Sequence, residues 1–336
     1  MIRIAVDAMG GDHAPSAVVD GAVSAARHLA VRVALVGPSA VLEQTLASYP
    51  DWRTLGLEIV DAPDVVAMAE SPAAALRRKP RASIRVAADL VARGEAAALF
   101  SAGHTGATVL AAHAAFGMIP GVDRPALAAT IPTRARPAVL LDAGANVDCR
   151  PPHLLQFAVM GGVYARVALG IDRPRVGLLS IGEEETKGNE LTRDAHRLLK
   201  ASPVHFIGNV EGRDIYSGIA DVVVCDGFTG NVVLKTSEGL VDTVETLLGD
   251  ELKGTFSSHV GYLLSRRAFR RFRRRVDYSE YGGAPLLGVA RLAIVGHGRS
   301  SAKAVRNAIA VAYRFATSDF LHRVEREIAA ATVANR

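Results

Sequence analysis

The chain of 336 residues is 49% hydrophobic and only 5% aromatic, enough apolar material for one large α/β domain or two smaller ones. Its only cysteines, Cys149 and Cys225, fit neither a disulfide framework nor a zinc motif, so we expect a reducing cytoplasm. No run of about 18 uncharged apolar residues occurs, which argues against a membrane-spanning helix.

The basic character comes from one segment. Seven of the 39 lysines and arginines are arginines that lie between Arg266 and Arg275. Without them, 32 basic residues remain against 34 acidic ones, so the rest of the chain is slightly acidic. This balance and the scarcity of aromatic residues argue against a nucleic-acid-binding protein.

Short β-prone runs alternate with helical stretches along most of the chain. Strands are predicted at 2–7, 31–36, 57–60, 96–100, 126–131, 138–141, 175–180, 204–207, 221–224 and 292–295. Helices are predicted at 16–30, 39–48 and 83–93, after Gly103, after Pro151 and Pro152, and at 302–317 and 320–331. The basic segment 70–84 is predicted to be an exposed loop that faces an anion or only solvent. This alternation predicts a three-layer α/β/α fold with a mainly parallel sheet, in a single catalytic domain spanning 1–336.

The pattern changes between residues 232 and 276. Two helical stretches, 232–252 and 257–275, follow each other without a strand, which predicts a helical pair that projects from the sheet. The second stretch has an apolar stripe bordered by arginines, a pattern typical of a helix lying on an anionic membrane. Docking of an acidic protein and a dimer interface are alternatives. The predicted contact residues are Leu264, Arg266, Arg267, Arg270, Arg271, Phe272 and Arg274.

Turns rich in glycine and polar residues follow the predicted strands. The first contains Gly10 and Gly11 and leads into a helix near Pro15, and similar turns recur at least six times. In parallel sheets ligands bind at the carboxyl ends of the strands, and glycine turns and helix N-termini present N–H groups to anions. The predicted substrate-binding residues are Asp7, Gly10, Gly11, Asp12, Ser101, Gly103, Thr105, Gly106, Asp142, Gly144, Asn146, Asn189, Asp226, Thr229, Gly230 and His297. For Asp7, Asp142 and Asp226 the alternative is a structural role in fixing turns.

Common nucleotide and nucleophile motifs are absent. The nearest dinucleotide fingerprint, at Gly296-His-Gly298, lacks its third glycine, and Lys187 precedes its glycine instead of following one as a phosphate loop requires. No nucleophile elbow occurs, and the histidines lack the spacing of metal ligands. The sequence therefore predicts an anion site without a nucleotide signature.

The motifs as a set resemble the bacterial phosphate acyltransferase of phospholipid synthesis, the PlsX family. They are Asp7-Ala-Met-Gly-Gly-Asp-His-Ala-Pro15, Ser101-Ala-Gly with Thr105-Gly-Ala107, Asp142-Ala-Gly-Ala-Asn146-Val-Asp148, Lys187-Gly-Asn-Glu190, Asp226-Gly-Phe-Thr-Gly-Asn231 and Tyr281-Gly-Gly-Ala-Pro-Leu-Leu-Gly288. They cover essentially the whole chain in the family's order. Two positions depart from the family: His104, where Asn is usual, and Arg299, where Ser is more frequent.

The resemblance implies a homodimeric cytoplasmic enzyme that makes acyl phosphate from inorganic phosphate and acyl-[acyl carrier protein]. The product would pass to a membrane glycerol-3-phosphate acyltransferase, so we expect peripheral association with the inner face of an anionic membrane. A fold like that of phosphotransacetylases and isopropylmalate dehydrogenases is also implied, without a metal or organic cofactor. The alternatives are a metal- and NAD-dependent hydroxy-acid dehydrogenase and a phosphotransacylase that uses coenzyme A.

Attack of phosphate on a thioester requires placement of the anion and stabilisation of the tetrahedral oxyanion, because a thiol of pKa about 8.5 leaves readily. Lys187 and the glycine turns suit the phosphate. Asn231, with Thr229 and the Gly230 N–H, suits the oxyanion. His13 or His104 is the candidate for protonating the leaving sulfur, whereas the cysteines have no recognisable partner base for an acyl-enzyme.

Overall fold

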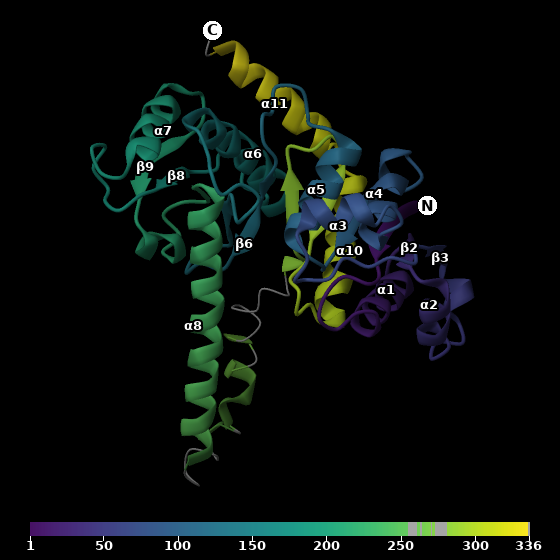
Figure 1. Cartoon of the computed structure of the whole chain (residues 1–336). Helices are drawn as coiled ribbons and strands as arrows, with labels where there is room; N and C mark the ends of the chain where they lie inside the picture. The colour runs from purple at the N-terminus through teal and green to yellow at the C-terminus, as the bar shows by residue number, and fades with distance from the viewer. Residues whose placement is uncertain (255–260, 263, 270, 273–280, 335–336) are drawn as a thin grey trace.

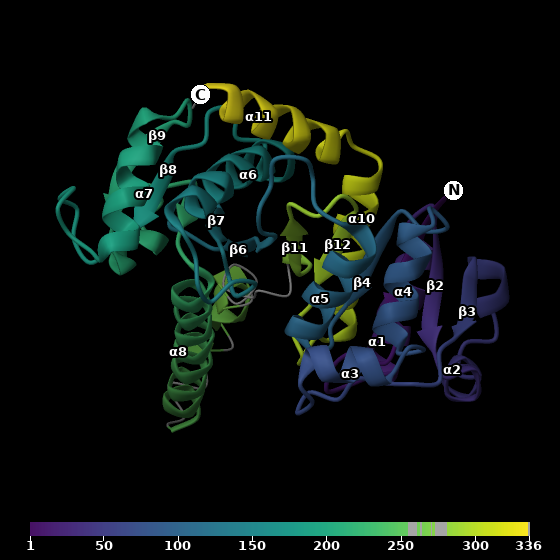
Figure 2. The same ribbon diagram turned by 45° about the horizontal axis from the view of Figure 1, so that its top comes forward.

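In the computed structural model, which describes residues 1–254, 261–262, 264–269, 271–272 and 281–334, the strands form two sheets (Figures 1 and 2). The seven-stranded sheet has the order β3 (Leu57–Asp61), β2 (Val31–Gly37), β1 (Ile2–Asp7), β4 (Ala98–Ser101), β12 (Leu292–Val295), β11 (Ala284–Leu287) and β5 (Ala126–Leu127). The five-stranded sheet has the order β6 (Ala129–Ile131), β7 (Ala138–Leu141), β10 (Val222–Val224), β8 (Val176–Leu179) and β9 (Phe206–Val210). The predicted α/β/α class is confirmed, but the prediction of one sheet is wrong.

Helices cover the sheets on both faces. They are α1 (Ser16–His28), α2 (Ser39–Leu46), α3 (Pro72–Arg78), α4 (Ser83–Ala92), α5 (Thr105–Phe116), α6 (Pro151–Leu169), α7 (Glu190–Ala201), α8 (Gly227–Gly254), α10 (Ala302–Ala316) and α11 (Phe320–Ala334). In Figure 2, α11 runs from the seven-stranded half across to α6 of the other half. Short 3₁₀ turns lie at Trp52–Leu55 and Gly212–Tyr216.

Strand β1 shows why the sequence folds into layers. Ile4 and Val6 point to the core shared with α1 and α10, whereas Ala5 points to the core shared with α4 and α5. Side chains alternate between the two faces of a strand, and here both faces are buried. A strand buried on both faces needs the nearly continuous apolar run that the sequence has.

The strand register brings the polar turns to one edge of each sheet. Asp7 at the end of β1 pairs with Ser101 of β4, and Ser101 pairs with Val295 of β12. In the other sheet, Val224 of β10 pairs with Leu141 of β7. The turns that follow these parallel strands therefore begin at the same level.

The predicted strand at 126–131 is two strands. Leu127 of β5 pairs with Leu286 of β11, whereas Ala129 of β6 pairs with Leu140 of β7. The chain thus passes from one sheet to the other at Ala128, which is itself buried. Since the whole run is apolar and buried in both sheets, its pattern does not reveal the change of partner.

Two other elements were not predicted. The strand β11 contains Pro285 and follows Gly282 and Gly283, a composition that favours a turn. Helix α3 lies in the basic segment that was predicted to be a loop; it begins with Pro72 and is only seven residues long.

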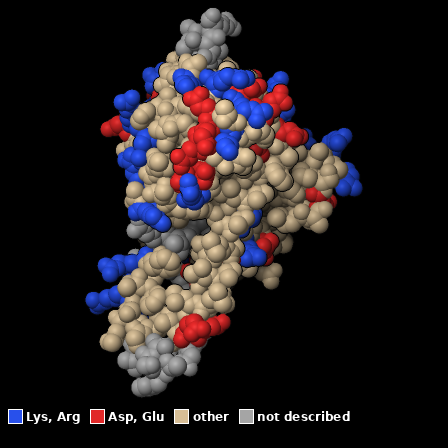
Figure 3. Space-filling model, turned by 90° about the vertical axis from the view of Figure 1, so that its left-hand side faces the viewer, with Lys and Arg blue, Asp and Glu red and all other residues tan. Residues whose placement is uncertain are grey.

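Helix α8 projects away from both sheets (Figure 1). It begins at Gly227, before the predicted start at 232, and the described helical residues between 261 and 272 run beside it. Leu248, Ala268 and Phe272 line a groove between them. Much of this projection is uncharged on the face in Figure 3.

The predicted contact residues on the second helix are exposed where they are described. Leu264 is 84% exposed and Phe272 48%, and Arg266, Arg267 and Arg271 are also exposed. Arg270 and Arg274 lie outside the described residues. Within the described part of the chain, no helix combines the length and the apolar character needed to cross a bilayer.

Candidate active site

A cavity of about 430 Å³ lies between the two sheets, at the edge where their strands end. The turns after β1, β4, β7 and β12 contribute to its wall, as do α8 and α10. Six residues predicted from the sequence line it: Asp12, Gly103, Thr105, Gly144, Asn231 and His297. The cavity therefore brings together residues that are far apart in the sequence.

A charged cluster at the mouth of the cavity joins α8 to the turn after β12. Lys235 Nζ lies 2.8 Å from Glu238 Oε2 and 2.7 Å from His297 Nε2, and Glu238 Oε2 lies 3.2 Å from His297 Nε2. Burial alone raises the pKa of Glu238, but the contacts with His297 and Lys235 outweigh burial and hold the pKa below its usual range. Glu238 is therefore a carboxylate that fixes both nitrogen-bearing side chains.

The sequence reasoning missed Lys235 and Glu238, although a signal was present. Lys235 follows Asn231 by four residues, so the two side chains lie on one face of α8. The spacing was overlooked because the helix was predicted to begin at 232, after Asn231, whereas α8 begins at Gly227. Asn231 contributes an amide and Lys235 a cation to the same wall of the cavity.

Two helix N-termini also meet the cavity. Thr105 begins α5, and Ser300 and Ala304 flank the start of α10. A helix N-terminus carries unsatisfied N–H groups and a partial positive charge, which favour anions. Lys235 and Arg299 add two cations to the lining, beside the carboxylates of Asp12 and Glu238.

His104 has a structural role at the start of α5. Its Nδ1 accepts a hydrogen bond from the Gly106 N–H at 3.1 Å, so the imidazole caps the helix. Asn, the residue expected here from the resemblance, is a favourable N-cap for the same reason, since its side-chain oxygen accepts such a bond. The departure at 104 thus preserves the cap, and His104 is not among the residues that line the 430 Å³ cavity.

Asp7 ties two turns together beneath the cavity. The Ser101 hydroxyl donates to its Oδ2 at 2.7 Å, and the Gly103 N–H donates to Ser101 Oγ at 3.1 Å. A Cβ on Gly10 would lie 2.6 Å from Gly103 N and 2.8 Å from Asp7 Oδ2, so only glycine fits. Burial raises the pKa of Asp7 and outweighs its hydrogen bonds, which lower the pKa. The structural alternative for Asp7 is the better description of these contacts.

Gly11 fixes the neighbouring turn. Its φ of +107° is one that glycine adopts without strain, and a Cβ there would lie 3.0 Å from Gly298 O. The next N–H, that of Asp12, donates to Gly298 O at 2.7 Å. The turns after β1 and β12 are thereby held together at the cavity.

Asp142 organises the turn after β7. Its carboxylate accepts hydrogen bonds from the N–H groups of Leu127, Gly144, Ala145 and Asn146 and from the Asn146 side chain, at 2.7–3.1 Å. Burial raises the pKa of Asp142, and these bonds oppose that effect. The Asn146 amide also donates to Pro125 O at 2.6 Å, so its donors are used within the fold.

The start of α8 is fixed in a similar way. Asp226 accepts hydrogen bonds from the Thr229 N–H at 2.8 Å and the Thr229 hydroxyl at 2.7 Å. A Cβ on Gly230 would lie 1.9 Å from Asp142 O, so α8 and the turn after β7 touch at this point. These contacts place Asn231 against Gly144 at the wall of the cavity.

Four predicted residues lie elsewhere. Lys187 and Asn189 are exposed on the loop between β8 and α7, where Asn189 caps α7 by accepting from the Thr192 N–H at 2.9 Å. Strand β8 is two strands from β7, roughly 10 Å at the usual spacing. His13 is exposed, and Gly106 lies in the first turn of α5. None of the four is among the residues lining the cavity. The predicted role of Lys187 in binding phosphate stays a prediction, since the described structure places Lys187 outside the lining of this cavity.

The cysteines have the properties of unreactive thiols. Cys225 is 3% exposed, and burial raises its pKa well above the usual range. Burial likewise raises the pKa of Cys149 to about 11. Neither is poised as a nucleophile.

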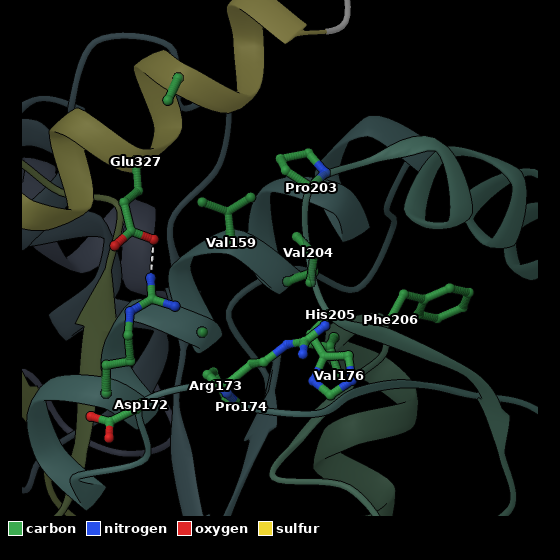
Figure 4. A pocket seen from close by; sticks show the side chains of 14 residues that line it. Val159, Asp172, Arg173, Pro174, Val176, Pro203, Val204, His205, Phe206 and Glu327 are labelled. Atoms are coloured by element: carbon green, nitrogen blue, oxygen red, sulfur yellow. Dashed lines mark hydrogen bonds and ion pairs between the residues drawn. The ribbon is translucent and has the colours of Figure 1, made fainter.

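A second cavity, of about 600 Å³, lies at the opposite ends of β8 and β9 (Figure 4). Arg166 of α6 and Glu327 of α11 form an ion pair at its wall. It contains none of the residues predicted to bind the substrate. We therefore assign the candidate active site to the cavity between the sheets.

Comparisons with known proteins establish the family and the fold of the chain. The family described as fatty acid synthesis protein matches residues 2–323. The phosphate acyltransferase of Acidobacterium capsulatum is 54% identical, with 97% of each chain covered, and that of Geotalea uraniireducens is 51% identical, with 97% of this chain and 94% of the relative covered. The crystal structure of a phosphotransacetylase from Streptococcus pyogenes matches with a TM-score of 0.61 at 17% identity, covering 94% of each chain, which shows a shared fold. These matches do not favour the dehydrogenase alternative. The chain belongs to the PlsX family of phosphate acyltransferases, and it is an acyltransferase.

Proposed function

We propose that this enzyme transfers a fatty acyl group from acyl-[acyl carrier protein] to inorganic phosphate and releases acyl phosphate for phospholipid synthesis. The observation that carries the proposal is the mixed lining of the cavity. Lys235, Arg299 and two helix N-termini line it together with buried apolar side chains such as Phe100 and Leu127. A phosphate and an acyl chain require such a combination.

The reaction has one bond-forming and one bond-breaking event at the acyl carbon. A phosphate oxygen attacks the thioester carbonyl, the tetrahedral intermediate collapses, and the C–S bond breaks to release the carrier thiolate. The thiolate then takes a proton from solvent or from a group of the site, and the acyl group remains bonded to phosphate oxygen. The protein's task is to place the anion and to stabilise the oxyanion.

The described side chains divide this task. The Asn231 amide, held against Gly144, is suited to donate to the oxyanion. Lys235 and the N-termini of α5 and α10 are suited to hold phosphate. Asp7, Ser101, Asp142, Asn146 and Asp226 support these groups by fixing the turns, and Lys187 remains a proposed phosphate ligand.

The projecting helices support a proposal about partners. Leu240, Val244 and Leu247 of α8 are 62%, 43% and 61% exposed, and their spacing puts them on one helix face. This stripe is suited to a second copy of the chain, giving a homodimer. The exposed Leu264 and the arginines beside it are suited to the inner face of an anionic membrane, where a membrane glycerol-3-phosphate acyltransferase would take up the product.

The donor is tested by comparing two thioesters. Free thiol is measured as it is released from acyl-[acyl carrier protein] and from the coenzyme A thioester of the same chain, with and without phosphate. Phosphate-dependent release that is faster from the carrier protein supports the proposal. Faster release from coenzyme A would instead support the phosphotransacylase alternative.

A further inference from the structure

The cavity changes character from its mouth to its inner end. At the mouth, the Met68 residue is 53% exposed and the Lys235 side chain 49%. Other lining residues, among them Phe100, Leu127 and Ala308, are buried, at 0%, 3% and 1% exposure, and we take them as the inner wall. A ligand whose charged group binds at the mouth would therefore have its apolar part away from water.

Small side chains keep the inner end open. Ala308 lies beyond the first turn of α10, and Ala129 of β6 contributes from the other sheet. Both are buried, at 1% and 7% exposure, and each ends at its Cβ. Any larger side chain at these positions would occupy cavity volume.

The volume sets a rough limit on what the cavity can enclose. An apolar cavity of about 150 Å³ holds a ring of about six carbons, so by proportion about 430 Å³ holds roughly seventeen heavy atoms. A phosphate takes about five of these, which leaves space for on the order of ten carbons of a chain. The inner wall can therefore limit the number of carbons in the acyl chain that fits.

We propose that Ala129 and Ala308 determine the acyl-chain length that this enzyme accepts, together with Leu127. The inference rests on the proposed function, since it takes the acyl chain to be the apolar part of the substrate. Discrimination follows from enclosure, because each carbon that fits the apolar wall is favoured and each carbon that collides with it is rejected.

The test uses hexanoyl, dodecanoyl and palmitoyl donors on one carrier. Ala308→Leu should lower kcat/KM for dodecanoyl relative to hexanoyl at least about tenfold, because the added carbons displace chain carbons. Leu127→Ala should shift the preference toward the longer chains. Ala310→Leu is the matched control on α10, since Ala310 is only partly buried and is not among the residues lining the cavity; its chain preference should equal that of the wild type.

Equilibrium binding of acyl phosphonates of increasing length gives a readout that does not need turnover. Parallel loss of affinity for the longer phosphonates in Ala308→Leu supports the inference. Unchanged length preference in a folded Ala308→Leu protein, in both turnover and binding, would overturn it, as would an equal shift in Ala310→Leu. Absence of acyl phosphate from wild-type protein with every donor would contradict the proposed function instead, and phosphonate binding would still decide on the chain pocket.

Discussion

Asn231 and Lys235 lie one turn apart on α8 and reach the cavity from the same side. Asn231→Ala and Lys235→Ala should each lower kcat/KM at least about 100-fold, comparable to the loss of one oxyanion-hole donor. Lys187→Ala should act mainly by raising KM for phosphate, because Lys187 is proposed as a ligand of that anion alone. Steady-state kinetics with varied phosphate separates the two effects.

The control for these lysine variants is Lys200→Ala. Lys200 lies on α7, is exposed and forms a surface ion pair with Glu185. It is not among the described residues that line the cavity. Its rates should match the wild type. Near-normal kinetics of both Asn231→Ala and Lys235→Ala would show that the reaction takes place elsewhere.

The cysteines give a second prediction at the scale of single residues. At neutral pH a Cys149 thiol with a pKa of about 11 is almost entirely protonated, and Cys225 is buried. Iodoacetamide should therefore leave the folded protein unmodified over a time in which it modifies the denatured chain, as read by intact mass. The Cys149→Ala/Cys225→Ala protein should keep its activity; an acyl-enzyme trapped on either sulfur would disprove this view.

Residue types and their order predicted which polar turns come together, because turns after parallel strands meet at one edge. Asp12, Gly103, Thr105, Gly144, Asn231 and His297 line one cavity for this reason. The pattern could not separate side chains that face the cavity from those used within the turns. Asp142 and Asn146 have the same polar character as Asn231, but their hydrogen bonds are made to neighbouring backbone.

At the scale of elements, the strands with uniform apolar runs were predicted within a few residues, since burial on both faces leaves a strong signal. The split of 126–131 into β5 and β6 was not, because it depends on which partner each half meets. Strand β11 was missed because its glycines and Pro285 have turn propensity. Tertiary pairing overrides local preference at both places.

Asp221, just before β10, is a buried carboxylate with two partly exposed arginine partners, and its charge can be tested by pH. Asp221 is 1% exposed; burial raises its pKa, but hydrogen bonds from Arg175 and Arg136 outweigh burial and lower it. A lowered pKa means that stabilisation is complete above the unfolded pKa of about 3.9 and is lost as pH falls through the folded value. Asp221→Asn should lower the free energy of unfolding by roughly 2 kcal/mol at neutral pH.

Urea unfolding of both proteins at neutral pH and near pH 3 measures this difference. The difference in unfolding free energy between wild type and Asp221→Asn should narrow in acid, because the Asp221 carboxylate takes up a proton in the unfolded chain at a higher pH than in the folded protein. The control is Asp194→Asn, because Asp194 is half-exposed and pairs with Arg197 on the surface. This variant should change the free energy of unfolding little at either pH. An equal difference in unfolding free energy at both pH values would show that Asp221 is not ionised in the folded protein.

The whole molecule combines a cavity between two sheets with an apolar and basic projection. Leu264→Glu/Phe272→Glu should abolish salt-sensitive sedimentation with anionic vesicles and leave activity in solution unchanged, since both residues belong to the projection. Arginines near an anionic surface contribute about 1 kcal/mol each, weakened by salt. The control is Ile181→Glu, which removes an 82% exposed apolar side chain from another surface. Failure of the wild type to sediment at low salt would exclude the membrane role.

The most direct test of the account is the fate of phosphate oxygen. Enzyme, acyl-[acyl carrier protein] and phosphate labelled in every oxygen with ¹⁸O are mixed, and the acyl product is analysed by mass spectrometry as it forms. If phosphate attacks the acyl carbon in the cavity between the sheets, the product is acyl phosphate that keeps all of the label, and Asn231→Ala or Lys235→Ala suppresses it. Release of carrier thiol without labelled acyl phosphate, or at the same rate without phosphate, would contradict the account.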